Sequence, residues 1–110
     1  MMANKTLNNN AVRIEKVELG VPDQRMVDLI IRLKEIQVIR FRQSFLDVIG
    51  MSKQQYTQIE NGKQHFTIEH ITIACRTYNV NANWIFGLET KVFRGNRPQA
   101  GDKNDLNIDE

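Results

Sequence analysis

The sequence predicts an all-α fold of five helices, and three patterns favour that class. Apolar residues recur every three or four positions between residues 23 and 37, which is the spacing of one helix face. Gly50 and Gly87 each follow an apolar segment, as glycines that end helices do. Ser52 stands two residues after Gly50 and is a strong N-cap residue. We therefore expect short helices joined by tight turns, ending at about residue 88.

The first helix is expected over residues 23–37. Asp23 follows Pro22 and is predicted to be its N-cap. The predicted core positions are Met26, Leu29, Ile30, Leu33 and Ile36. Charged residues, among them Arg32 and Lys34, take the opposite side, so this helix is amphipathic.

The second helix is expected within residues 41–50, where Gly50 stops it. A third helix begins within about three residues, because Ser52 and Gln55 form the spacing of a capping box. The inward positions of this third helix are Tyr56 and Ile59. The turn signal Asn61–Gly62 ends the helix.

Thr67 is expected to cap a fourth helix, which Asn79 ends in a left-handed conformation. Asn81 is expected to cap a short fifth helix that Gly87 stops. Residues 90–94, TKVFR, fit no element clearly. The predicted buried positions of these helices are Ile68, Ile71, Ala74, Cys75, Tyr78, Trp84, Ile85 and Phe86.

Three segments are predicted along the chain. Residues 1–22 are expected to form an N-terminal arm, although a weak apolar alternation also allows a short strand there. Residues 23–90 form the expected domain, and residues 91–110 a mostly disordered tail rich in Gly, Asn, Pro, Asp and Lys. The last nine residues hold four acids against Lys103, a net charge of −3 (1 − 4).

Composition excludes several classes of protein. The formal net charge is +2, and the hydrophobic fraction of 41% suffices for a small core. Cys75 is the only cysteine, so neither an intrachain disulfide nor a cysteine zinc site is expected. No secretory signal or membrane span is recognisable, which favours the cytoplasm. No nucleophile–base pair, phosphate-binding glycine loop or metal-binding histidine spacing occurs, so we expect no enzyme, cofactor or metal.

Two short helices joined by a tight glycine turn, the second polar on its outer face, form the helix-turn-helix pattern. A protruding helix of this kind fits the major groove of DNA. Glutamine can bond adenine bidentately, and lysine can donate to guanine. The side chains that share the expected outer face are Lys53, Gln54, Thr57, Gln58 and Asn61. Ser52 and the helix N-terminus could also bind a phosphate.

The segment MSKQQYTQIENGK, residues 51–63, followed by FTIEHITIACRTYNVNANWIFG, resembles a known family. It is similar to the phage-repressor and Cro type of helix-turn-helix domain, also called the xenobiotic-response-element type. Residues 59–63, IENGK, match the family pattern outright. The resemblance covers residues 41–88 well and residues 23–40 loosely. It implies a five-helix lambda-repressor-like domain with flexible N- and C-terminal segments.

The resemblance also implies roles for single residues. Lys53, Gln54 and Gln58 stand where the family reads base edges. Gln55 and Thr57 lie beside them and are further candidates for base reading. The phosphate-binding positions are Arg42, Ser52, Asn61 and Lys63. Leu46 stands where the family prefers a small residue, so it should widen or rotate the contact behind the recognition helix. Phe41 replaces the usual Ser or Thr cap, so the second helix should begin differently.

The sequence thus favours a sequence-specific double-stranded DNA-binding transcriptional regulator, a repressor that acts as a homodimer. Two domains about one helical turn apart read an inverted repeat and roughly double the contacts. Candidate dimer surfaces are the fifth helix with residues 90–94, and the arm around Val12 to Leu19. The alternatives are an antitoxin of a toxin–antitoxin pair, which grips its protein partner through a terminal segment, and a protein-interaction module on the same fold.

Overall fold

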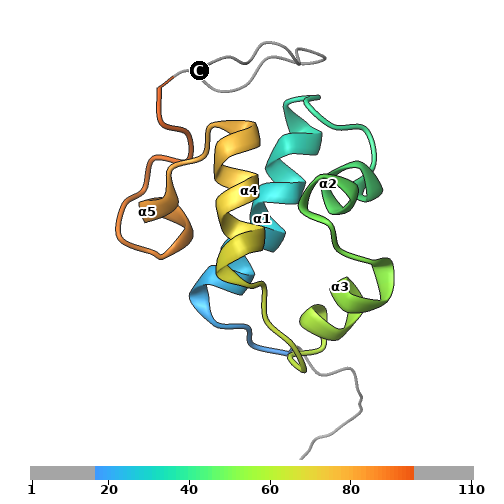
Figure 1. Ribbon diagram of the computed structural model, residues 1–110. Coiled ribbons are helices and arrows are strands. Elements are labelled where there is room, and N and C mark those ends of the chain that lie inside the picture. Colours follow the sequence, from blue (N-terminus) through green and yellow to red (C-terminus); the bar gives the residue numbers. More distant parts are fainter. Residues whose placement is uncertain (1–16, 96–110) are drawn as a thin grey trace, which may run out of the picture.

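A computed structural model describes residues 17–95 of the chain (Figure 1). Its five helices are α1 (Val21–Glu35), α2 (Arg42–Ile49), α3 (Lys53–Glu60), α4 (Ile68–Tyr78) and α5 (Ala82–Ile85). The described part contains no strand, only an isolated bridge, so the predicted all-α, five-helix fold is confirmed. Most of the predicted arm and tail, including the acidic end, lies outside the described residues.

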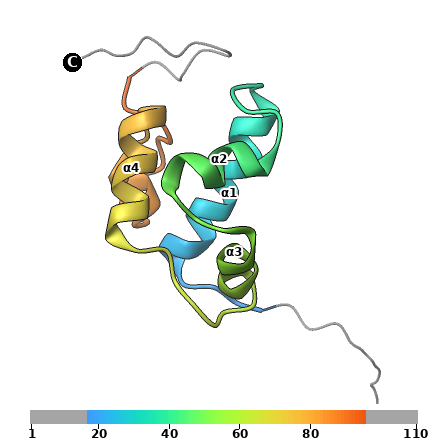
Figure 2. The same ribbon diagram turned by 45° about the vertical axis from the view of Figure 1, so that its right-hand side comes forward.

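The core lies between α1, α2 and α4, with α3 and α5 on opposite sides of the domain (Figures 1 and 2). The apolar stripe predicted for α1 is buried, because Met26, Leu29 and Leu33 are fully covered. Phe45 of α2 stacks on Tyr78 of α4, with ring centroids 5.6 Å apart. No helix of the described residues has the length and apolar character that a bilayer span requires.

The prediction that Asp23 caps α1 is wrong. The N-cap is Gly20, and no side chain caps this helix end. Pro22 lies within the first turn, where its missing N–H costs nothing because that group has no helical partner. Asp23 is therefore in the first turn, where a negative charge is favourable, and its side chain is free to bind elsewhere.

The turn between α2 and α3 forms as predicted. Gly50 has a φ of 75°, a left-handed conformation that glycine adopts without a steric penalty. The N–H of Met51 donates to the carbonyl of Leu46, which closes the end of α2. Ser52 then caps α3 in a complete capping box with Gln55. Phe41 is the N-cap of α2 without a side-chain bond, and it is 62% exposed.

Two predicted core residues are exposed. Ile68 is 70% exposed and Phe86 is 41% exposed, and Cys75 is half-buried, whereas the other positions predicted for α4 and α5 are buried. Ile68 has the helical phase of Ile71, but α5 contains only four residues and leaves the first turn of α4 uncovered. Asn79, with a φ of 56°, ends α4 as predicted.

Residues 90–94 complete the core. Phe93 is 8% exposed and forms an antiparallel bridge with Val80, at the start of the loop before α5. The N–H of Asn81 donates to the carbonyl of Val92, and the N–H of Arg94 donates to the carbonyl of Asn79. The packed structure therefore continues beyond α5 to Phe93.

Candidate nucleic-acid interface

Helix α3 lies at the edge of the domain (Figure 2), and the polar side of this helix is exposed to solvent. Tyr56 and Ile59 are 2% and 1% exposed and fix the helix to the core. The predicted base-reading positions take the other side of the helix, and all of them except the half-buried Gln58 are exposed. They are Lys53, Gln54, Gln55, Thr57 and Gln58. The structure therefore brings these five side chains together on one surface.

The five side chains differ in the hydrogen bonds they already make. The Gln55 side chain accepts from the Ser52 N–H at 3.0 Å, and the Thr57 hydroxyl donates to the Lys53 carbonyl at 3.1 Å. Neither Gln54 nor Gln58, by contrast, has a side-chain hydrogen bond to any residue that the structure describes. The amides of Gln54 and Gln58 are thus available to an external partner, while Gln55 and Thr57 stabilise the helix.

The phosphate-binding positions surround this surface. The Ser52 hydroxyl accepts a hydrogen bond from the Gln55 N–H at 3.0 Å, and the Ser52 N–H donates to the Gln55 side chain. Both groups of Ser52 therefore take part in the capping box. The N–H groups of the next residues, Lys53 and Gln54, point out of the helix end as first-turn groups do. Asn61 and Lys63 are exposed in the turn after α3, where Gly62 has a φ of 77°.

Arg42 is held in place by an aromatic ring of the neighbouring helix. Its guanidinium carbon lies 4.9 Å from the centre of the Tyr56 ring, a cation–π contact between α2 and α3. Burial, with the negative charge of Glu60 as a smaller cause, raises the pKa of Tyr56 to about 12, against the opposing effect of Arg42. An arginine stacked in this way keeps N–H donors for an anion and loses less freedom when it binds one.

Comparison with known families decides what this arrangement is. A family model described as helix-turn-helix matches residues 45–85, from the middle of α2 to the last residue of α5. Residues 45–85 form a helix-turn-helix domain of the phage-repressor and Cro type. Domains of this family are DNA-binding and regulatory, so the protein is a DNA-binding regulator in general terms. No curated protein and no solved structure matches the chain.

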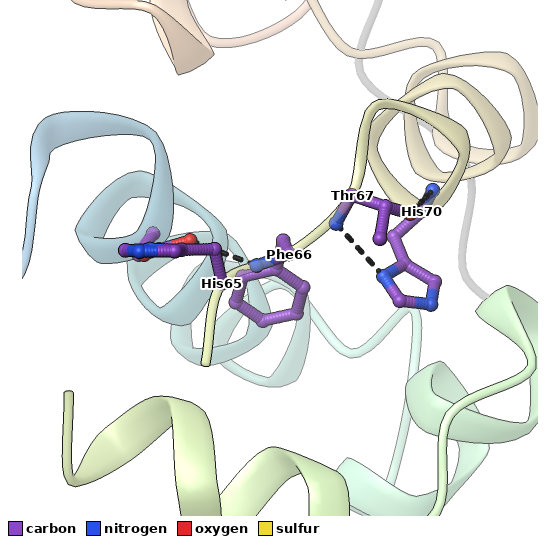
Figure 3. Close-up of polar contacts among 5 residues, drawn as sticks. His65, Phe66, Thr67 and His70 are labelled. Atoms are coloured by element: carbon purple, nitrogen blue, oxygen red, sulfur yellow. Dashed lines mark hydrogen bonds and ion pairs between the residues drawn. The ribbon is translucent and has the colours of Figure 1, made fainter. Parts of the chain in front are cut away.

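A buried carboxylate anchors the loop that follows the recognition helix of this helix-turn-helix domain. Asp23 is 5% exposed, and its two oxygens lie 2.9 Å from the Phe66 nitrogen and 2.7 Å from His65 Nδ1. Figure 3 shows His65 and Phe66 at this contact, beside Thr67 and His70 at the start of α4. Sequence reasoning missed this role, because the partners are more than 40 residues apart and only the burial of Asp23 reveals it.

The loop of the helix-turn-helix domain is also fixed by aromatic packing. Phe66 is 6% exposed and meets the rings of Tyr56 and His70 edge-on, each with centroids 6.3 Å apart. A side chain placed on Gly62 would come 3.0 Å from a methyl group of Val17, so the chain before α1 passes close to this loop. The recognition helix is therefore braced at its end as well as at its cap.

The helix-turn-helix domain has a further basic residue near the candidate interface. Lys34 of α1 lines one hollow together with Arg42 and Lys53, and the acid Glu60 lines it too. Sequence reasoning treated Lys34 as a solvated helix residue. Among the described residues no cluster of His, Cys, Asp and Glu could hold a metal ion.

Proposed function

We propose that this protein is a sequence-specific regulator of transcription that binds double-stranded DNA as a homodimeric repressor. Helix 52–60 is the element that enters the major groove. The proposal rests on Gln54 and Gln58, whose side-chain amides form no hydrogen bond to a described residue. They lie on the outer face of a helix that Ser52 caps and that Tyr56 and Ile59 fix to the core.

The proposed base contacts follow from the chemistry of the side chains. Gln54 and Gln58 lie four residues apart on one helix face, and each can bond adenine bidentately. Lys53, at the first position of α3, can donate to guanine. Gln55 and Thr57 contribute mainly by stabilising the helix, because their polar atoms already bond within it.

Phosphate contacts set the position of the domain on the duplex. Arg42 at the start of α2, and Asn61 and Lys63 after α3, stand on either side of the recognition helix along the chain. The Ser52 hydroxyl retains its proton as a donor beside the open N-terminus of α3. Such contacts strengthen binding to every sequence and carry no base information.

Dimer formation follows from the amount of DNA that one helix can read. A single recognition helix contacts only a few base pairs, whereas two related helices about 34 Å apart read both halves of an inverted repeat. A dimer bound across a promoter excludes the polymerase by occupancy alone. For this reason we favour repression over activation.

The proposal is tested by selecting duplexes from a random pool with the full-length protein. We expect an enriched motif with inverted-repeat symmetry, and an affinity that falls steeply with salt as phosphate counterions are released. The test variant is Gln54→Ala with Gln58→Ala, and its control is Asn83→Ala, an exposed residue of α5 on the side of the domain away from α3. Enrichment of no motif by the unaltered protein would contradict the proposal and favour a protein-interaction module.

A further inference from the structure

An open apolar groove lies between α4 and α5. In the ribbon diagram α5 lies on the side of α4 that is away from α3 (Figure 1). The groove has a volume of about 470 Å³ and is called here the α4–α5 groove. Its lining includes the two exposed side chains that were expected in the core, Ile68 and Phe86, together with Cys75 at its wall. Exposed apolar residues that meet in one hollow are a common sign of a binding surface.

Two arginines border this apolar surface. Arg76 of α4 and Arg94, beyond the bridge at Phe93, both line the groove. Neither forms an ion pair with a carboxylate of the described residues, where the ion pairs are Arg32–Glu35 and His65–Asp23. A surface of this kind fits a short peptide that carries apolar side chains next to acidic ones.

The chain itself contains such a peptide. Residues 105–109 read DLNID, with Leu106 and Ile108 between aspartates, inside the terminal stretch of net charge −3. Leu106 is 12 residues beyond Arg94 (106 − 94), which lines the groove. Twelve residues span at most about 40 Å, so this segment can return to the groove.

We propose that residues 105–109 dock in the α4–α5 groove of the same chain. Leu106 and Ile108 cover the exposed side chains of Ile68 and Phe86. The aspartates that flank them pair with the guanidinium groups of Arg76 and Arg94. Because the groove lies away from α3, the recognition face stays open, and this proposal does not depend on DNA binding.

A weak contact is enough for this docking. A tether of about 12 residues gives the attached peptide an effective concentration on the order of millimolar. Closing a loop of about 12 residues adds only a modest entropic cost, which grows slowly with length. The ion pairs lie at the surface, so docking should weaken as salt increases.

Cys75 provides the test, since it is the only cysteine and lines the groove. In full-length Asn107→Cys, a mild disulfide oxidant should join the new thiol to Cys75 within one chain. The matched control carries Asn107→Cys together with Leu106→Ser and Ile108→Ser, which leaves the groove and the linker unchanged. We expect the intramolecular disulfide to form at least tenfold faster without the serine changes, and this advantage to shrink at high salt.

Two outcomes would overturn the proposal. Equal rates in both variants would mean that the thiols meet only by random motion of the tail. A disulfide that joins Cys75 of one chain to position 107 of another, with a rate that rises with protein concentration, would assign the groove to a second copy. Reactivity of Cys75 toward a small thiol reagent, measured in both variants, and DNA binding by gel shift check that the domain itself is unaltered.

Discussion

The carboxylate of Asp23, in the first turn of α1, accepts a hydrogen bond from the backbone N–H of Phe66, in the loop after α3. Its second oxygen lies 2.7 Å from His65 Nδ1 in the same loop. The side chain of Asp23 is buried, so these contacts replace water as its partners. One carboxylate thus connects the first helix of the domain to the loop between the candidate DNA-binding helix and α4.

Removal of this carboxylate should destabilise the domain. Asp23→Ala leaves the buried Phe66 N–H without an acceptor, which costs about 1–3 kcal/mol of unfolding free energy. Urea denaturation measures the change. Asp47→Ala is the control, because the exposed Asp47 carboxylate accepts from Gln43 alone among the described residues, so its loss should cost less than about 0.5 kcal/mol. Equal losses of unfolding free energy in the two variants would show that the Asp23 contacts stabilise the domain no more than one exposed side-chain hydrogen bond does.

Substitution of the recognition glutamines should change base preference. Gln54→Ala or Gln58→Ala should cost about 1–3 kcal/mol of binding free energy on the selected site and relax the preference at one base pair. Gln55→Ala should instead lower protein stability, because Gln55 completes the capping box with Ser52. Quantitative binding to single-base variants of the site separates the two effects. If Gln55→Ala alone altered base preference, the assignment of roles on α3 would be reversed.

Arg42→Ala should weaken binding to all duplexes by a similar factor. The slope of log affinity against log salt should fall by roughly one, as expected for one lost phosphate contact. Arg32→Ala is the matched control, since Arg32 is exposed on α1 and paired with Glu35. Fluorescence anisotropy over a salt series gives both slopes. A loss confined to the selected site would assign Arg42 to a base.

Tyr56 should ionise at a higher pH than an ordinary tyrosine does. Its pKa is raised from 10.0 to about 12, chiefly by burial, so the fold favours the neutral phenol. That preference contributes its full stability below pH 10 and loses it as the pH rises through about 12. Phenolate absorbance measures the titration, and the late transition of Tyr56 should be absent from Tyr56→Phe. Ionisation of Tyr56 near pH 10 would mean that its hydroxyl reaches water freely.

Leu46→Ala should be costly even though the family usually has a small residue there. Leu46 is fully buried, so its truncation leaves a cavity and should cost about 2–5 kcal/mol of unfolding free energy. Val48→Ala on the same helix is the control, because Val48 is 40% exposed and should cost less than about 1 kcal/mol. Thermal or urea unfolding compares the two. A small loss at Leu46 would mean that α2 and α3 close over the gap.

The sequence predicted what depends on near neighbours. Ser52, Thr67 and Asn81 were placed correctly as caps, because capping is decided within three residues of a helix start. Gly50 as a helix stop and Asn79 as a left-handed helix end were predicted correctly for the same reason. Asp23 was misplaced because Pro22 allows the helix to begin before it.

Burial at the edges of the core could not be read in the same way. Ile68 has the right helical phase but no element covers it, whereas Phe93 lies outside any helix and is buried. The outer face of α3 was predictable from helix geometry. The engagement of Gln55 in its cap was also visible in the sequence, but that pairing and base reading compete for one side chain. The identity of the DNA bases remains a prediction for selection to test.

Val17 approaches Gly62 closely, so the two ends of the described chain lie beside different surfaces. The chain enters the helices beside the loop that follows α3, within a side chain's length of the candidate DNA surface. It leaves at Gly95, next to Arg94 on the rim of the α4–α5 groove. A segment joined before Val17 therefore starts beside the candidate DNA surface, while one joined after Gly95 starts at the rim of an apolar groove.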